Sequence, residues 1–521
     1  MASEVSDPEQ PKLSFFERIL KKDGRSSSQD DMDGAREPLV TVVADRRAED
    51  YSRCAAILPF LFPALGGLLY GYDIGATSGA SVSLESAELS GTTWYNLSSI
   101  ELGVVVSGSV YGALIGSIVA FNVADFLGRR RELIVSSTLY IIGALITALA
   151  PDFAILVIGR LVYGVGIGLT MHAAPMYIAE TAPMQIRGLL ISLKECFIVL
   201  GMLLGYTIGS LEVDLVGGWR YMYATSIPLS IIMFIGMLWL PASPRWLLLC
   251  AMQNRDNTEE FKNRAVCAFC KIRGQPIDIV ASEHISEMLV DLSFMEEEKQ
   301  ASFREVFQGK CLKALIIGCG VVFFQQVTGQ PSVLYYAATI LQTAGFTAAS
   351  ESTRVSILLG FLKLIATGVA VLVVDKVGRR PLLITGVTGI VSLLLLDIGI
   401  VSLFMLAGYY LLLKDIPFVA VIALLLYVSC YQLSFGPIGW LLISEIFPLR
   451  LRGRGLSIAV LVNFGANALV TFAFSPLREL LGAGILFAGF GVIAILSLIF
   501  IIIYVPETKG LTLEEIEAKI L

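Results

Sequence analysis

Charged side chains are scarce in this sequence. Asp, Glu, Lys and Arg make up only 16% of its 521 residues, and histidine occurs twice. Soluble domains carry about 25% charged residues, so the shortage excludes an ordinary water-exposed surface. The formal net charge is -6 and no stretch is rich in Lys or Arg, which excludes the basic surface of nucleic-acid-binding proteins. We expect no nucleic-acid partner.

Cysteine is sparse as well, and its eight residues are scattered, which excludes a disulfide framework. Cys267 and Cys270 form one CxxC pair, but zinc would need two more ligands and only His284 is near in the sequence. The other histidine, His172, lies in an apolar run, and no Ser–His–acid site can be assembled from the sequence. We expect no metal, no cofactor and no enzymatic activity.

Long apolar segments are abundant instead. Hydrophobic residues make up 55% of the chain, and its mean hydropathy is +0.75. A helix of about 20 apolar residues crosses the hydrocarbon core of a bilayer. The sequence therefore predicts an all-α membrane protein with twelve transmembrane helices, near 54–76, 102–124, 132–150, 154–178, 189–210, 220–240, 312–336, 355–375, 382–405, 416–441, 454–475 and 483–505.

Polar stretches divide these spans into two sets of six. Residues 1–50 contain no apolar run of the kind found in a signal peptide, and 243–310 are rich in charge. We predict a disordered cytosolic tail (1–50), an N-terminal six-helix half (51–242), a cytosolic linker (243–310), a C-terminal six-helix half (311–506) and a cytosolic tail (507–521).

Arginine is distributed unevenly over the short loops. Arg129, Arg187, Arg379 and Arg452 fall in alternate loops, whereas residues 77–100 contain no Lys or Arg. The positive-inside rule places the arginine-containing loops and both tails in the cytosol. Asn96-Leu97-Ser98 is a glycosylation acceptor only if its loop faces a lumen or the exterior, and the sequence does not decide whether it is used.

The two halves repeat one another in sequence. Asp125-Phe126-Leu127-Gly128-Arg129-Arg130 recurs as Asp375-Lys376-Val377-Gly378-Arg379-Arg380, and the loop from Glu180 to Arg187 recurs from Glu445 to Arg452 with equal spacing. Pro241-Ala-Ser-Pro244-Arg245 has a weaker counterpart in Pro506-Glu507-Thr508-Lys509-Gly510. Two related halves in one orientation describe a carrier that rocks around a midplane site.

These motifs, with Gln325-Gln326, Tyr335-Tyr336 and Gly436-Pro437 to Trp440, resemble the sugar porter family of the major facilitator superfamily from residue 50 onward. Within that family the chain is similar to plant vacuolar glucose transporters, also described as D-xylose:proton symporter-like proteins. The resemblance implies the major facilitator fold and transport of a monosaccharide. It also implies the vacuolar membrane, with the plasma membrane and the plastid envelope as alternatives.

Asp73 lies within the first predicted span, where a lone carboxylate costs several kcal/mol. Counting 1.5 Å per residue places Asp73 about 5 Å and Arg160 about 10 Å from the outer surface, so the two could meet. Arg160 would hold Asp73 ionised, and loss of the contact would favour protonation, which couples a proton to helix movement. The resemblance supports symport, because proton-coupled members have an acid here. The alternative is that Asp73 caps a broken helix.

The resemblance implies that Gln325, Gln326, Asn463, Trp440 and Tyr335 bind the sugar. Amides offer donors and acceptors to hydroxyl groups, and an indole offers a flat apolar face. A neutral sugar suits such a lining better than an ion. The alternative role of the amides is packing between helices.

The chain departs from the family at three positions. Glu195 replaces a common glutamine, Lys363 an asparagine and Pro331 another asparagine. Because Glu195 and Lys363 lie at neighbouring depths, we hypothesise that they form an ion pair across the halves or line the cavity, with Glu195 as a second proton site. Two alternatives stay open: Lys194 is the partner of Glu195, or water solvates both charges.

The charged loop motifs predict ion pairs between the halves that close the cytosolic side and so favour one of two conformations. Phe126 replaces the usual basic residue, which predicts a weaker N-terminal copy. The predicted gating residues are Asp125, Arg129, Arg130, Glu180, Arg187, Asp375, Arg379, Arg380, Glu445 and Arg452.

The sequence thus predicts a secondary active transporter whose partners are a monosaccharide, a proton and the lipid bilayer, and we expect a monomer. A facilitative uniporter and a sugar/proton antiporter of the vacuolar membrane are the alternatives. Glucose and xylose differ by one hydroxymethyl group, so the sequence does not name the sugar.

Overall fold

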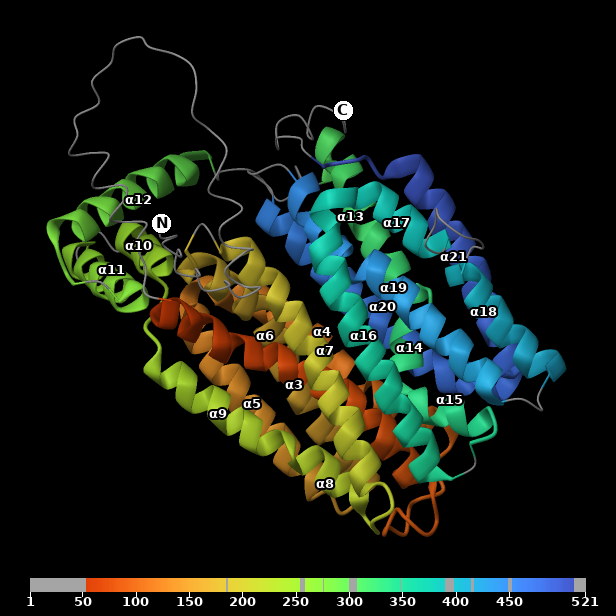
Figure 1. The fold of residues 1–521 in the computed structure, drawn as a ribbon. Helices are drawn as coiled ribbons and strands as arrows, with labels where there is room; N and C mark the ends of the chain where they lie inside the picture. Colours follow the sequence, from red (N-terminus) through yellow and green to blue (C-terminus); the bar gives the residue numbers. More distant parts are fainter. Residues whose placement is uncertain are drawn as a thin grey trace, which may run out of the picture. The chain divides into compact units, whose positions relative to one another are not determined.

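The computed structural model describes residues 53–183, 186–253, 258–274, 276–298, 307–346, 348–388, 398–413, 417–447 and 452–509, and these residues form helices and their connections only (Figure 1). Eleven of the described helical segments are long and apolar enough to cross a membrane. The remaining predicted span, 382–405, is described in part, as α17 (Arg379–Thr388) and α18 (Ile398–Gly408). The predicted tails lie almost wholly outside the described residues.

The N-terminal half contains α3 (Arg53–Glu85), α4 (Ser99–Leu127), α5 (Arg129–Ala148), α6 (Phe153–Thr181), α7 (Arg187–Glu212), α8 (Gly218–Ala224) and α9 (Ser226–Trp239). The first helix continues for 33 residues through Pro59 and Pro63, well beyond the predicted end at 76. Asp73 is therefore inside a continuous helix. It does not cap a broken one, and the capping alternative is wrong.

The C-terminal half contains α13 (Gly309–Val327), α14 (Gln330–Tyr335), α15 (Ala337–Thr343), α16 (Ala349–Val377), α17 and α18, the π-helical turn η3 (Tyr409–Leu413), α19 (Pro417–Ile446), α20 (Arg452–Leu481) and α21 (Ala483–Tyr504). A single span was predicted at 312–336, but the structure breaks it into α13 and α14, and the short α15 follows. Gly329 has a φ of +92°, which favours glycine, and Pro331 follows in the first turn of α14.

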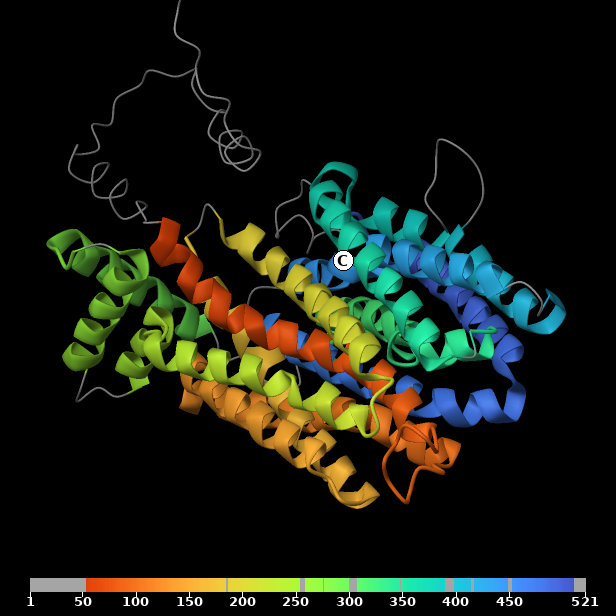
Figure 2. The same ribbon diagram turned by 60° about the horizontal axis from the view of Figure 1, so that its bottom comes forward.

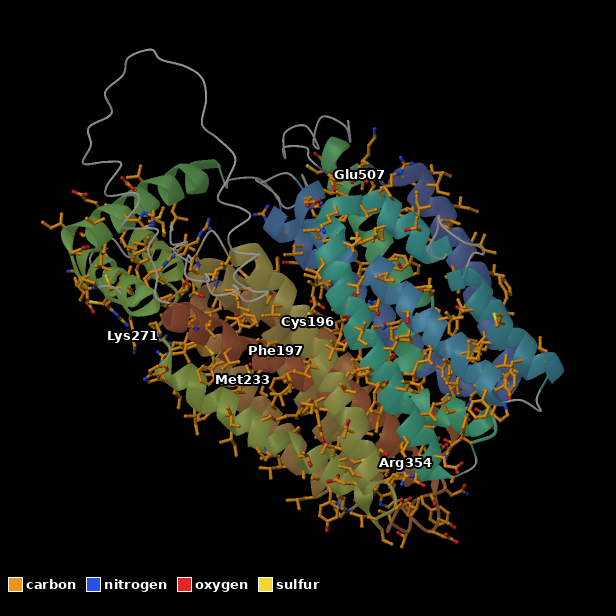
Figure 3. The ribbon with its side chains drawn as sticks, in the orientation of Figure 1. Cys196, Phe197, Met233, Lys271, Arg354 and Glu507 are labelled. Carbon is orange, nitrogen blue, oxygen red and sulfur yellow. The ribbon has the colours of Figure 1, made fainter. Side chains whose placement is uncertain are left out.

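The predicted linker is helical. It forms α10 (Pro244–Gln253), α11 (Thr258–Arg273) and α12 (Ile279–Glu298), which surround a small apolar cluster that includes Leu248, Phe269 and Ile285. Lys271 (Figure 3) donates a hydrogen bond to the carbonyl of Trp239 at 3.3 Å, which ties α11 to the end of α9. In this α11, Cys267 is exposed and Cys270 is buried.

Two pairs of long helices join the halves, α4 with α20 and α7 with α16. The yellow α7 and the cyan α16 lie side by side in Figures 1 and 2. Glycines permit both approaches. A Cβ on Gly103 would lie 2.8 Å from the Phe472 carbonyl oxygen, and a Cβ on Gly360 would lie 3.2 Å from the Leu203 Cα. Small residues of this kind allow membrane helices to pack closely.

The halves also touch where α3 meets α14 and α15, at the end away from the repeated arginine motifs. Ser78 Oγ accepts a hydrogen bond from the Ala338 amide at 3.0 Å, and Ser81 Oγ lies 3.3 Å from Thr339 Oγ1. We call the other end, which carries Arg129, Glu180, Arg379 and Glu445, the arginine-rich end.

Candidate transport sites

Asp73 and Arg160 form a buried ion pair between α3 and α6. Arg160 also donates to Ser109 Oγ at 2.9 Å and to the Val105 carbonyl at 3.2 Å, and Ser109 donates to Asp73 Oδ2 at 2.7 Å. Both charged side chains are 2% exposed or less. A buried carboxylate with this many donors is stable as an anion, and it loses that stabilisation when the donors move away.

Aromatic rings and a small cavity surround this pair. The guanidinium carbon of Arg160 lies 5.0 Å from the centre of the Tyr223 ring. The cavity is lined by Asp73, Arg160, Tyr163 and Tyr223, among others. Tyr335, on α14 of the other half, is fully buried near Asp73 and Arg160, and its hydroxyl has no hydrogen-bond partner among the described residues.

Three of the predicted sugar-binding amides gather at the interface of α13, α19 and α20. Gln326 Nε2 donates to Asn463 Oδ1 at 2.6 Å, and Gln325 Nε2 donates to the Phe435 carbonyl at 2.9 Å. The Gln325 Oε1 atom is buried without a hydrogen-bond partner. An unsatisfied buried acceptor is costly, and a ligand hydroxyl would satisfy it.

The break between α13 and α14 lies beside these amides. It leaves carbonyl groups without helical partners, and tyrosines of α19 satisfy them: Tyr431 donates to the Gln325 carbonyl at 2.9 Å and Tyr427 to the Thr328 carbonyl at 3.0 Å. Irregular backbone within a membrane needs such partners and is typical of binding sites in transporters.

The other predicted sugar-site residues are not hydrogen-bonded to this amide cluster in the part of the chain that the structure describes. Trp440 is half-buried. The residue before it, Gly439, lies against the amide cluster, since a Cβ atom built on Gly439 would be 3.3 Å from Gln325 Oε1. Tyr335 lies with Asp73 and Arg160 instead. Lys363 is buried on α16.

Glu195 pairs with Lys194, its neighbour on α7, at 3.6 Å, which is one of the two alternatives left open by the sequence. Lys363 lies beyond the 4 Å of an ion pair but interacts electrostatically with Glu195. The proposed contact between the halves is thus not formed in this conformation. Cys196 and Phe197, which follow Glu195 on α7, are labelled in Figure 3.

The repeated loop motifs form the same network in each half. Arg129 Nε lies 3.2 Å from Glu180 Oε1, and Arg379 donates to Glu445 Oε1 at 2.9 Å. The second oxygen of each glutamate accepts from a hydroxyl, of Ser243 and of Thr508. Arg130 and Arg380 each donate to a carbonyl near the end of the sixth and the last span, Leu238 and Ile502.

These networks correct one prediction. The charged motifs were expected to pair across the halves, but both ion pairs that the structure describes at this end join residues of one half. Each arginine follows a glycine with positive φ, Gly128 or Gly378, at the corner between two helices of its own half. Glu507 (Figure 3) completes the C-terminal copy by accepting from the backbone amides of Arg379 and Arg380. The predicted side chains outside the described set are Asp125, Arg187, Asp375 and Arg452.

The sequence analysis missed several members of these sites. Ser109 and Tyr223 carry no signal that distinguishes them from packing residues. Glu132 and His172, by contrast, are ionisable residues inside predicted spans, which is a signal in itself. The structure joins them: His172 Nδ1 lies 3.0 Å from Glu132 Oε1.

Comparison with known proteins agrees with this architecture. Residues 60–520 match the family described as sugar (and other) transporter. The chain is 65% identical over 515 residues, 99% of each sequence, to D-xylose-proton symporter-like 2 of Arabidopsis thaliana. It is 61% identical over 490 residues to the chloroplastic D-xylose-proton symporter-like 3 of that plant, covering 92% of this chain and 86% of the relative.

Among solved structures, the chain is similar to the xylose transporter XylE from E. coli in a partially occluded inward-open conformation. The TM-score is 0.72 at 29% identity, covering 88% of this chain and 100% of the other. This similarity and the eleven membrane-length apolar helices among the described residues confirm the major facilitator fold. A match over most of the chain also makes it a carrier rather than an enzyme, and the chain belongs to the sugar transporter family.

Proposed function

We propose that this transporter moves a monosaccharide, D-xylose or D-glucose, together with a proton by alternating access between its halves. The observation that carries the proposal is the buried Asp73–Arg160 pair, an ionisable group inside the membrane. Such groups in membrane helices usually serve transport or proton transfer. The relatives named D-xylose-proton symporter-like and the xylose transporter XylE support the same substrate class.

Asp73 is the proton carrier in this scheme. Arg160 and Ser109 donate hydrogen bonds to the carboxylate and so favour its ionised form. A shift of α3 relative to α4 and α6 within this half would lengthen these hydrogen bonds and favour the protonated acid. Tyr335 supports a link to the sugar site, because it lies on α14, which follows directly after α13, the helix that carries Gln325 and Gln326.

Sugar binding is assigned to Gln325, Gln326 and Asn463, with Trp440 as an apolar face. The orphan Gln325 Oε1 accepts from a sugar hydroxyl, and the Gln326–Asn463 contact offers one further donor and one acceptor. In this scheme Lys363 and Glu195 replace the amides that relatives have at these positions. Their charges change the electrostatic potential of the cavity. Glu195 remains a candidate for a second proton site.

The networks at the arginine-rich end hold each half together as it rocks. We place this end in the cytosol, following the positive-inside rule. The vacuolar membrane is our proposed location. A chloroplastic relative keeps the plastid envelope as an alternative. We propose that the transporter acts as a monomer.

The test uses purified protein in proteoliposomes without an imposed gradient. Adding D-xylose or D-glucose outside should raise the external pH, because symport carries protons inward with the sugar. Uptake of labelled sugar without a pH change would overturn proton coupling and leave a uniporter. A fall in external pH would indicate antiport.

A further inference from the structure

Glu132 and His172 form another ionisable pair in the N-terminal half. The Glu132 side chain is 2% exposed, His172 is 20% exposed, and His172 Nδ1 lies 3.0 Å from Glu132 Oε1. The other carboxylate oxygen, Oε2, is buried without a hydrogen-bond partner. The pair belongs to neither the sugar site nor the ion-pair networks described above.

The pair stands at one end of a polar stripe between α5 and α6. On α5 the stripe consists of Glu132, Ser136, Tyr140 and Thr147, which share one helical face because they are four or seven residues apart. All four are buried. The stripe continues on α6, where Thr170 donates to Ser136 at 2.8 Å and the Tyr163 ring centre lies 4.8 Å from that of Tyr140.

The other end of the stripe reaches Asp73. Thr147 and Tyr163 line the same small cavity as Asp73 and Arg160. From Arg160 to His172 the stripe covers 12 residues of α6, about 18 Å along the helix. Gly166 permits the close approach of α5, since a Cβ atom at this position would lie only 3.0 Å from the Ser136 carbonyl oxygen.

We propose that Glu132 and His172 form a proton-exchange site through which the proton carried by Asp73 passes to the arginine-rich end. This inference rests on the proposed symport. The Asp73 carboxylic acid gives up its proton to a water molecule in the small cavity beside Thr147 and Tyr163 and becomes a carboxylate. Water molecules and hydroxyl groups along the stripe each accept one proton and release another, which requires the hydroxyls of Tyr140 and Tyr163 to leave their backbone carbonyl partners. The neutral His172 imidazole gains a proton and becomes an imidazolium beside the Glu132 carboxylate, and it then releases that proton to water.

Helix packing alone does not explain these residues. Neighbouring positions of the same interface hold α5 and α6 with hydroxyl groups, Ser136 and Thr170, at much lower cost than an ionisable pair. An imidazole titrates near neutral pH and its accessible edge can exchange protons. Glu132 orients the ring and stabilises its charged form.

Other charges at this end set the local field. Arg129 is paired with Glu180, Arg130 is bound to the Leu238 carbonyl, and α9 contributes no ionisable side chain. Among the described side chains, the titratable and charged groups toward this end of the elements packed on α5 and α6 include Arg129, Arg130 and Arg131 on α5, Tyr177 and Glu180 on α6, Lys194 and Glu195 on α7, and Arg245 on α10.

The experiment compares Glu132→Gln and His172→Gln with wild type in proteoliposomes. Sugar counterflow, which needs no net proton movement, should stay within about twofold, whereas pH-driven uptake should fall about tenfold or more. The pH profile of driven uptake should also shift. His284→Gln is the matched control, because it removes the only other histidine.

Direct titration gives an independent measurement. In the His284→Gln protein, His172 is the sole histidine, so the NMR signal of labelled histidine reports its protonation. We expect it to titrate between pH 5 and 8 and to shift its midpoint in Asp73→Asn. This measurement keeps Glu132, so it decides the question even if Glu132→Gln does not fold.

Equal loss of counterflow and driven uptake in the Glu132→Gln and His172→Gln variants would show a structural role and overturn the inference. Unchanged driven uptake in these variants would also overturn it. A histidine signal that does not titrate would overturn it too. Failure of the proposed function is distinct, because wild-type protein would then show no sugar-induced pH change.

Discussion

Arg160 donates hydrogen bonds to both Asp73 and Ser109, and Ser109 in turn donates to Asp73, so that three side chains from α3, α4 and α6 form a closed triangle. Three helices of one half are thereby joined through a single ionisable carboxylate. Protonation of Asp73 weakens two sides of this triangle at once. Protonation of Asp73 is therefore coupled directly to movement of these helices.

Removing the cation tests this triangle. Arg160→Met should lower stability by about 3–5 kcal/mol, because it leaves a buried charge without its partner. Adding Asp73→Asn should restore part of that loss, since the unpaired carboxylate is then gone. Thermal unfolding in detergent of both single variants and the double variant measures the effect. If the stability lost by the double variant equals the sum of the losses of the two single variants, the pairing is contradicted.

The amide cluster should set sugar affinity. Asn463→Ala leaves Gln326 Nε2 without its acceptor and removes one group that can bind a hydroxyl. We expect sugar binding to weaken about tenfold, about 1.4 kcal/mol. Gln342→Ala, a half-buried glutamine at the far end of the site's half, is the control. Unchanged affinity in Asn463→Ala, measured by calorimetry, would remove the cluster from the sugar site.

The partner of Glu195 can be decided by double-mutant cycles on transport. From the Lys194 contact we expect Glu195→Gln and Lys194→Gln to be coupled in the conformation described here. If α7 and α16 slide during transport, Glu195 also couples to Lys363, and exchanging these two residues should restore transport that Glu195→Gln loses. Failure of that exchange would leave Lys194 as the sole partner.

The networks at the arginine-rich end should behave as pairs within each half. Reversing both charges of one pair, Arg379→Glu with Glu445→Arg, should recover stability that either change alone loses. The control combines Arg129→Glu with Glu445→Arg, which belong to different halves. Recovery in this control, rather than in the matched pair, would mean that the ion pairs form between the halves.

Much of the fold could be predicted because it follows from length and hydropathy. The spans, the repeat and the linker position are visible in the sequence. The break at Gly329 was missed because the span was assigned from hydropathy averaged over 312–336, and hydropathy does not respond to a left-handed glycine. The helices of 243–310 were missed for the opposite reason, since their charges hide a small apolar cluster.

Site residues could be predicted where an ionisable side chain lies within a membrane span. Asp73 and Arg160 could be matched by depth alone, and the structure pairs them. Which of two lysines would pair with Glu195 could not be predicted, because depth in the membrane does not fix the distance between side chains on different helices. The direction of the loop arginines also could not be predicted. It depends on the glycine corners at Gly128 and Gly378, whose φ values are +78° and +108°.

Asp73→Asn gives the most direct test of the central claim, that a proton on this carboxylate drives the sugar. In proteoliposomes with an imposed pH gradient, wild-type protein should accumulate labelled D-xylose or D-glucose above the external concentration. The variant should lose that accumulation and keep exchange of internal for external sugar. Accumulation by Asp73→Asn at the wild-type level would contradict the account.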